Sequence, residues 1–464
     1  MNTMTDTLLR PTLLAVLLAL GLAGCTSGPD YVKPQMAIPA SFKEDGRWKS
    51  AEPQDAAPRG PWWQVYNDPR LDQLMDTLNS QSPSIAQAEA QYRQARALLD
   101  QAEASLWPSL GANASHTRGV SSSGGDAANQ YSLSVNASWE LDLWGGVRRA
   151  VEAGKAKEGA SVAQLEAVRL SSQAQLATAY LQLTVADQQL QQLQSSEQLL
   201  SDSLALTRNQ FAVGIVSDAD VAAAESQWKT AQTAVLDKQL TRSQLEHAIA
   251  AALGSQPSSF SLPPATTMPH LPQIPPGVPS TLLERRPDIA AAERAVAEAN
   301  AQIGIAQAAA FPTLTLSASG GYKSSSFANW ISLPNRIWSL GPQLAMTLFD
   351  AGLRKAQTAQ AVASYDASVA SYRQTVLAAF QSVEDNLAAQ ALLQQENAHL
   401  QAALDAARRA ETLTRNQYQA GTVSYLNVLT TQNSRIAAEN NLWSIKNRQY
   451  ASSVALIAAI GGKW

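Results

Sequence analysis

Four segments of the chain alternate between apolar and polar residues with a period of two. The clearest, residues 131–142, reads YSLSVNASWELD. Three further segments alternate in the same way, at residues 109–117, 311–321 and 337–349. This period is typical of a β-strand with one apolar face. The pattern therefore predicts four strands in two hairpins, each strand about 9–12 residues long, which suits a tilted strand in a membrane.

Two environments would explain such strands. In a soluble sheet the apolar face would pack on a core. In a membrane barrel Leu133 would face lipid and Ser134 the lumen. Four strands cannot close a barrel, and open strand edges are not tolerated in lipid, so the membrane interpretation requires several chains. A dimer would supply eight strands and a trimer twelve. Pro342, within the last segment, forfeits a ladder hydrogen bond and argues mildly against this interpretation.

Long helices are predicted after each pair of strands. Residues 160–213 and 353–420 contain neither proline nor glycine, and Ala, Leu, Gln, Glu and Arg predominate in them. A helix over residues 146–212 would be about 100 Å long, which does not fit inside a compact domain. Valine recurs every seven residues at Val362, Val369, Val376 and Val383. This interval is typical of coiled-coil packing against neighbouring helices.

Each long stretch ends in nearly the same phrase, LTRNQFAVGIVS in the first and LTRNQYQAGTVS in the second, 207 residues apart. Gly214 and Gly421 are suited to end a helix, because glycine readily adopts the left-handed C-cap conformation. Ser217 and Ser424 are suited to begin the next helix as N-caps. The repeated phrase therefore predicts the same helical hairpin tip twice.

Further matched segments, such as SPSIAQAEA with RPDIAAAER, show that the duplication covers most of the chain. Its period is too long for a solenoid. We expect two equivalent halves, residues 62–253 and 287–464, joined by a proline-rich connector at residues 254–286. The β-hairpins fall near residues 109–142 and 312–349, and the helical tips near residues 208–220 and 415–427.

The first residues have the features of a lipoprotein signal peptide. Residues 11–24 are apolar but too few to span a bilayer, and they end in LAGC, which resembles the bacterial lipobox. We expect residues 1–24 to be removed, the single cysteine, Cys25, to carry an acyl chain such as palmitate, and residues 25–61 to form an extended arm. Thr26 in place of aspartate resembles lipoproteins that are sorted to the outer membrane.

Composition argues against several other classes of protein. The net charge of −4 gives no basic excess for nucleic acid. The histidines are scattered, at His116, His247, His270 and His399, so no metal site is expected. The sequence has no glycine-rich phosphate loop, nucleophile elbow or zinc pattern, and we therefore expect neither an enzyme nor a cofactor.

Several motifs, taken in chain order, resemble a known family. They are the lipobox, GPDYVKP, PWWQVYNDPRLDQL, ELDLWGGVRRA, ERRPDIAAAE, LFDAGLRKA and the two tips. Together they resemble the outer membrane factors, or TolC-like channels, in the lipoprotein branch of NodT-type outer membrane efflux lipoproteins. The resemblance implies an α+β membrane protein that forms a homotrimer. Four strands per chain would build a twelve-stranded outer-membrane β-barrel, continued by a long α-helical barrel in the periplasm, with a mixed equatorial region.

The implied function is the outer-membrane exit duct of a tripartite efflux system. It would passively conduct small molecules such as drugs, delivered by an inner-membrane pump through a periplasmic adaptor, and so contribute to multidrug resistance. Alternatives are a duct for protein secretion or metal export, and a periplasmic coiled-coil structural lipoprotein. The last would leave the four strands unexplained, and metal routes often carry Met-rich or His-rich segments, which this chain lacks.

The resemblance also implies roles for the tips. Adaptor docking would involve Arg208, Asn209, Gly214, Ser217, Arg415, Asn416, Gly421 and Ser424, although these residues could instead only cap helices. A gate at the periplasmic end would involve Asp220, Tyr418 and Leu426. Asn427 and Thr430 stand where the family often has acids, and Val423 where it sometimes has a basic residue. These departures argue against a cation-coordinating acidic ring.

Overall fold

The computed structural model describes residues 26–35, 60–120, 126–274 and 285–462. The expected signal peptide, Cys25 and most of the N-terminal arm lie outside these residues. The chain divides into two units. One, the sheet unit, contains Met1–Met36, Gln91–Val162 and Ala291–Gln374, and the other, the core unit, contains Ala37–Ala90, Ala163–Ala290 and Thr375–Trp464. Each unit therefore draws on both halves of the duplicated sequence.

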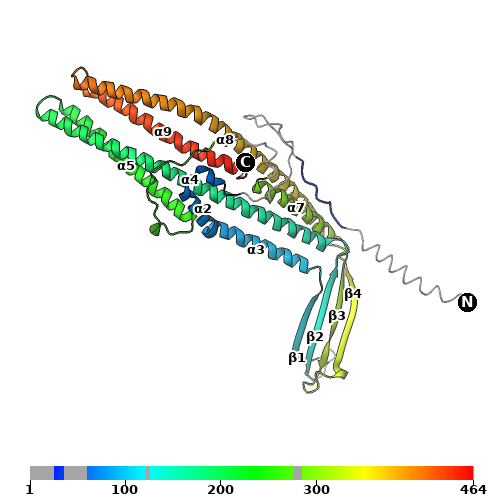
Figure 1. Ribbon diagram of the computed structural model, residues 1–464. Helices are drawn as coiled ribbons and strands as arrows, with labels where there is room; N and C mark the ends of the chain where they lie inside the picture. The colour runs from blue at the N-terminus through cyan, green and yellow to red at the C-terminus, as the bar shows by residue number, and fades with distance from the viewer. Residues whose placement is uncertain (1–25, 36–59, 121–125, 275–284, 463–464) are drawn as a thin grey trace. The chain divides into compact units, whose positions relative to one another are not determined.

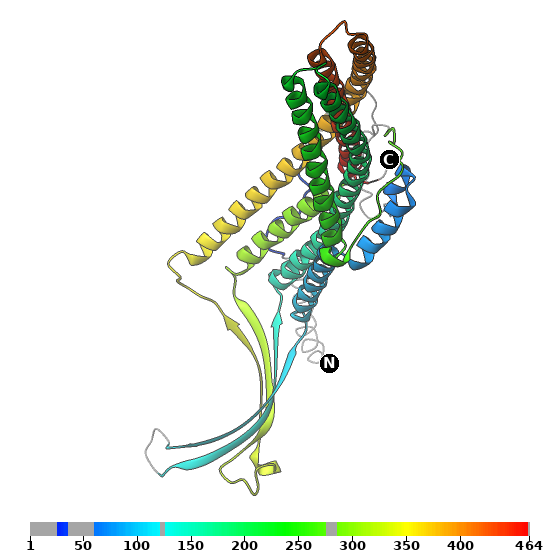
Figure 2. The same ribbon diagram turned by 90° about the vertical axis from the view of Figure 1, so that its left-hand side faces the viewer.

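The four expected strands form one antiparallel sheet in the order β1-β2-β3-β4. The strands are β1 (Ser109–Gly119), β2 (Ala128–Leu141), β3 (Thr313–Ser324) and β4 (Arg336–Ala345). β2 has 14 residues and exceeds the expected length. The central pair, β2 and β3, joins the two halves, and Figure 2 shows the strands twisting along their length. Pro342 lies in β4, an edge strand of this sheet, where proline is tolerated.

The register gives the sheet one apolar and one polar face. Residues opposite each other in neighbouring strands share a face, and Ala137 stands opposite Leu110 and Ala318, which in turn stands opposite Leu340. On the other face, serine hydroxyls pair across strands, Ser115 with Ser132 at 2.7 Å and Ser319 with Ser339 at 2.8 Å. Leu110 and Leu340 are 76% and 67% exposed. The apolar face is thus not covered by a core, contrary to the soluble-sheet interpretation.

The helices of the two halves have equal lengths. α4 and α8 have 67 residues each, α5 and α9 have 35, and α3 and α7 have 22. Their bounds are Pro83–Ala104 for α3, Gly146–Ala212 for α4, Asp218–Ala252 for α5, Pro287–Ala308 for α7, Leu353–Gln419 for α8 and Tyr425–Ala459 for α9. Figure 1 shows α4 with α5, and α8 with α9, turning back on themselves as hairpins. Within the described residues, none of the helices combines the length and apolar character that a membrane span requires.

The core unit is held together around the short N-terminal helices and the connector. The helix η1 (Trp62–Tyr66) and the helix α2 (Pro69–Gln81) bury Tyr66, Leu71 and Met75 against α4, α5 and α9. The described part of the connector, residues 254–274, contains only one short helix, η2 (Pro257–Ser259). The hydroxyl of Tyr450 donates to the carbonyl of Pro269 at 2.5 Å, and the amide of His270 donates to Tyr66 at 3.0 Å. These hydrogen bonds hold the connector against α9 and η1.

Candidate functional site: the hairpin tips

Both hairpins turn through a glycine in the left-handed conformation, with φ +77° at Gly214 and +72° at Gly421. The amides of Gly214 and Ile215 donate to Phe211 and Gln210, both at 2.9 Å, and the second tip has the same two bonds. This pattern is the Schellman C-cap. A Cβ on either glycine would meet no heavy atom within 4 Å, so the requirement for glycine is conformational. The C-cap prediction is confirmed.

The two returning helices begin differently. Ser217 and Asp220 form a capping box, in which the Ser217 hydroxyl accepts from the Asp220 amide at 3.3 Å and the Asp220 carboxylate accepts from the Ser217 amide at 3.0 Å. Ser424 occupies the N-cap position of α9, but its side chain makes no capping hydrogen bond. The residue three positions on is Asn427, which supplies no carboxylate to hold the serine. The side-chain cap expected at Ser424 is therefore absent.

A groove of about 820 Å³ lies between the two tips in the core unit. It is lined by parts of α4, α5, α8 and α9 and by both turns, and its lining includes Ser217, Asp220, Arg415, Tyr418, Gly421 and Ser424. These are six of the residues predicted from the sequence for docking or gating. Asn209 and Asn416 are exposed, and they are not among the lining residues. The structure thus brings together side chains from two tips that lie 207 residues apart in the chain.

The predicted gate residues have partners other than one another. The hydroxyl of Tyr418 donates to Gln210 Oε1 at 3.0 Å, and the ring of Tyr418 lies 5.5 Å from that of Tyr425. Burial, with smaller contributions from Asp220 and Tyr425, raises the pKa of Tyr418, so its hydroxyl remains a donor at neutral pH. Leu426 is 66% exposed and free to contact a further surface.

The paired arginines of the two tips also differ. Arg208 contacts Glu225 at 3.1 Å, and both side chains are about half exposed. Arg415 instead contacts Glu411 at 2.7 Å, and the Glu411 side chain is only 8% exposed. The Arg208 pair is therefore screened by solvent and contributes little, whereas Arg415 belongs to a buried network.

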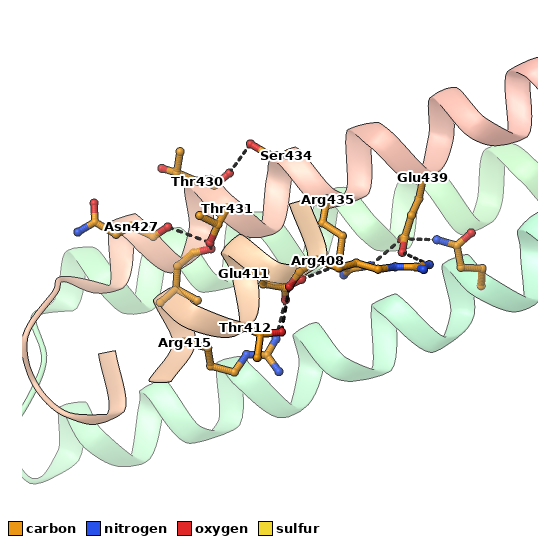
Figure 3. Close-up of polar contacts among 12 residues, drawn as sticks. Arg408, Glu411, Thr412, Arg415, Asn427, Thr430, Thr431, Ser434, Arg435 and Glu439 are labelled. Atoms are coloured by element: carbon orange, nitrogen blue, oxygen red, sulfur yellow. Dashed lines mark hydrogen bonds and ion pairs between the residues drawn. The ribbon is translucent and has the colours of Figure 1, made fainter. Parts of the chain in front are cut away.

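That network joins α8 to α9 below the second tip (Figure 3). Arg435 donates to Glu411 at 2.5 Å and to Glu439 at 2.6 Å, and Arg408 contacts Glu439 at 3.2 Å. Gln192 of α4 donates to Glu439 as well. The side chains of Glu411, Arg435 and Glu439 are 8%, 13% and 7% exposed. Each carboxylate has two arginine partners, which offsets the cost of burying its charge.

The first hairpin has different residues at the equivalent positions, 207 residues earlier. Leu204 replaces Glu411, Trp228 replaces Arg435 and Gln232 replaces Glu439. Leu204 is 3% exposed in a small apolar cluster against which Trp228 packs. Trp228 and Gln232 also donate hydrogen bonds to Glu197 of α4, at 2.6 and 3.4 Å. The first hairpin is thus joined by apolar packing and hydrogen bonds where the second is joined by ion pairs.

The buried network was not predicted from the sequence. The only signal was the i,i+4 spacing of Arg435 with Glu439 and of Glu411 with Arg415, which is common on solvated helices. Within the described residues, no group of three or more His, Cys, Asp or Glu side chains is placed to hold a metal ion. Cys25, the predicted lipidation site, lies outside the described residues.

The chain resembles known proteins over nearly its whole length. The outer membrane efflux protein family matches residues 74–255 and 278–462, in two segments. A probable efflux pump outer membrane protein of Pseudomonas putida, TtgC, is 31% identical over 459 residues, which cover 96% of this chain and 93% of that protein. The cation efflux system protein CusC of Escherichia coli is 28% identical, over 97% of this chain and 98% of CusC.

Solved structures give the same result. The outer-membrane channel OprN superposes with a TM-score of 0.85 and 30% identity, over 95% of this chain and 100% of OprN. Its fold is therefore the fold of this chain, with four strands and long helices as expected from the sequence. The family match spans well over half of the residues and relatives reach 31% identity. The chain therefore belongs to the outer membrane efflux protein family.

Proposed function

We propose that this chain is the outer-membrane exit channel of a tripartite efflux system. In this proposal three copies form a twelve-stranded barrel that continues as a helical tunnel into the periplasm. The channel passively conducts small molecules such as drugs, which an inner-membrane pump delivers through a periplasmic adaptor. The observation that carries the proposal is the four-stranded sheet with one exposed apolar face and one polar face.

The open edges of the sheet require partners from other copies of the chain. β1 and β4 are the edge strands of the described sheet, and an edge presents unpaired backbone amides and carbonyls. The exposed Leu110 and Leu340 suit lipid, but lipid offers no hydrogen bonds to an open edge. Pairing of β4 with β1 of another copy removes every edge. The number three comes from the resemblance to the family.

The test is the conductance of the purified protein in a planar bilayer, together with its mass in detergent. We expect discrete channels and the mass of a trimer. A monomeric mass without channel activity would overturn the proposal. Removal of the chain from cells that carry the cognate pump should raise drug sensitivity, which an unrelated structural lipoprotein would not do.

The proposal includes a lipid on Cys25 that anchors the mature chain in the outer membrane. It is supported by LAGC at the end of a short apolar segment. Mass spectrometry of the N-terminal peptide should find an acylated cysteine. An unmodified peptide that begins before residue 25 would refute the anchor.

The proposed docking surface for the adaptor is the groove between the tips, with Arg208, Asn209, Arg415 and Asn416 around it. The two related tips suit a partner that presents repeated hairpins. Because Arg415 also pairs with buried Glu411, charge reversal at Arg208 is the cleaner test. Arg208→Glu should lower adaptor binding and drug export while the trimer stays intact, and unchanged export would exclude this side chain.

The proposed gate comprises Asp220, Tyr418 and Leu426. Its support is that Asp220 and Tyr418 line one groove and that Leu426 is exposed beside it. Tyr418→Phe removes the bond to Gln210 and should raise the resting conductance, since one hydrogen bond is worth about 0.5–1.5 kcal/mol in each copy. Wild-type conductance in this variant would remove Tyr418 from the gate. Asp220→Asn keeps a side-chain oxygen that can accept the capping hydrogen bond from Ser217 but removes the negative charge. It therefore tests the charge of Asp220 separately from its capping role.

Metal ions are a second candidate cargo, because CusC is named a cation efflux protein. Sensitivity of deletion cells to a panel of transition-metal salts, compared with their sensitivity to organic drugs, separates the two candidates.

A further inference from the structure

The segment that follows residue 25 packs against residues of the sheet unit. The amide of Ser27 donates to the carbonyl of Trp144 at 2.9 Å. Asn300 of α7 donates to the carbonyl of Pro29 at 2.9 Å, and the Tyr31 hydroxyl donates to Glu293. Every one of these contacts is between residues far apart in the chain. We call residues 27–31 the strap.

A single arginine, Arg149, makes three hydrogen bonds to the strap. Arg149 Nε donates to the carbonyl of Ser27 at 3.1 Å, and Nη2 donates to the carbonyl of Gly28 at 3.2 Å and to Asp30 at 2.9 Å. The Arg149 side chain is only 5% exposed, whereas that of Asp30 is 91% exposed. The pair with Asp30 is therefore screened, and Arg149 holds the strap mainly through the two backbone carbonyls, while its Nη1 contacts Glu152 of the same helix at 2.7 Å. Two carbonyls suit the planar guanidinium, which lysine cannot imitate.

Two glycines allow the strap to approach this closely. A Cβ on Gly28 would lie 2.5 Å from Gly304 Cα. A Cβ on Gly304 would lie 2.8 Å from the Ser27 carbonyl oxygen and 2.8 Å from Arg149 Cγ. Glycine inside a helix such as α7 costs about 1 kcal/mol relative to alanine, and close backbone approach explains its presence.

The duplication supplies an internal comparison. Alignment of LWGGVRRA with FDAGLRKA pairs Arg149 with Lys355, which is exposed. Alignment of SPSIAQAEA with RPDIAAAER, continued along the helix, pairs Gly304 with Asp100, which is exposed as well. The contacts with the strap are therefore not a general feature of the repeated helices. Among the described residues, Arg149 and Gly304 make them where the N-terminal segment lies, and Lys355 and Asp100 do not.

The strap lies where the strands end. Trp144 lies three residues after the end of β2. Its indole donates to the carbonyl of Pro312 at 2.7 Å, and its ring stacks on Phe311 just before β3. Two residues span at most about 7 Å, so a lipid on Cys25 must attach near this end of the sheet whenever the strap is bound.

We propose that Arg149, Asn300 and Gly304 form a docking site for residues 27–31 that fixes the lipid of Cys25 at the helix-side end of the membrane sheet. This inference rests on the proposed lipidation of Cys25. Arg149 is a positioning residue, because it touches the strap and not the lipid. The docked strap places the acyl chains beside the barrel, in the membrane leaflet nearest the helices. The lipid anchor and the barrel therefore hold the protein in the membrane at the same depth.

The first test is hydrogen exchange of the strap amides in the intact, membrane-embedded protein. We expect slow exchange of the Ser27 amide in the wild type and exchange at least about tenfold faster in Arg149→Met, since charge-assisted bonds are lost. Gly28→Ala alters only the strap and should give the same result if Arg149→Met fails to fold. Asp30→Asn and Lys355→Met are matched controls and should leave exchange unchanged. Fast exchange in the wild type would overturn the docking site.

The second test separates positioning of the lipid from simple packing. Arg149→Met and Gly28→Ala are each made in the lipidated chain and in a chain exported by a non-lipoprotein leader with serine at residue 25. Mass spectrometry first verifies the lipid, so that failure of lipidation is recognised separately. We expect both variants to lower the temperature of trimer dissociation in lipid vesicles only in the lipidated chain. Equal shifts in both backgrounds would refute the positioning role, and Arg149→Lys should recover only part of the loss.

Discussion

Removal of Arg435 should loosen the second helical hairpin without disturbing the first. Arg435→Met leaves Glu411 and Glu439 buried, at 8% and 7% exposure, each with one arginine instead of two. Breaking a buried ion pair costs about 3–5 kcal/mol when nothing compensates. Because Arg415 and Arg408 remain as partners, we expect the lower end, about 3 kcal/mol. Amide hydrogen exchange should accelerate on the order of a hundredfold in the parts of α8 and α9 that lie between the network and the second tip.

A control of the same chemistry lies on the same two helices. Arg448 of α9 contacts Glu396 of α8 at 3.1 Å, but these side chains are 57% and 45% exposed. Arg448→Met should therefore cost less than about 1 kcal/mol. Equal effects of the two variants would refute the argument from burial.

The first hairpin suggests a compensating variant. The combined substitution Glu411→Leu, Arg435→Trp and Glu439→Gln introduces the residues that the first hairpin carries at these positions. The variant removes both buried carboxylates together with Arg435, and replacement of buried ion pairs by uncharged residues is often neutral or stabilising. We expect most of the lost protection to return. If amide exchange in the triple variant is as fast as in Arg435→Met, the loss of packing volume, rather than unpaired charge, causes the effect.

Two further predictions concern the sheet and the core. Leu133→Arg should reduce the stability of the inserted protein by up to about 2–4 kcal/mol and Ser134→Arg by much less, because only Leu133 lies on the apolar face. Unfolding from lipid vesicles measures both losses, and equal losses would exclude lipid contact on that face. Burial raises the pKa of Tyr450 from 10.0 to about 12, so its contribution to stability is complete below pH 10 and is lost as pH rises toward 12, since the unfolded chain ionises first. Tyr450→Phe should cost about 1 kcal/mol at pH 8 through the lost hydrogen bond to Pro269. The variant should also show a smaller drop in melting temperature as the pH rises from 10 to 12, and an unchanged drop would contradict the raised pKa of Tyr450.

The sequence predicts the regular parts of this fold because each is specified locally. The absence of proline and glycine predicts α4 and α8, the alternation around Leu133 predicts the apolar face, and Gly214 and Gly421 predict the turns. In each case the neighbouring residues along the chain contain the whole signal.

The site depends on contacts that no local pattern specifies. Asp220 bonds to Ser217 rather than to Tyr418, and Tyr418 bonds to Gln210 on the other hairpin. Glu439 meets Gln192 across 247 positions of sequence. Spacing along the chain cannot identify such partners, because exposed and buried charges have the same periodicity on a long helix. The domain boundaries and the roles of the tip residues stay predictions.

The equal lengths of the helices limit how this protein can change in size. An insertion of one heptad in α4 alone would push the first tip about 10 Å beyond the second, and the groove between the tips would be lost. To keep both tips level, the same insertion is required in the ascending and the returning helix of both halves. Changes in tunnel length should therefore be inherited as four matched insertions or deletions, which makes length much harder to vary than residue identity.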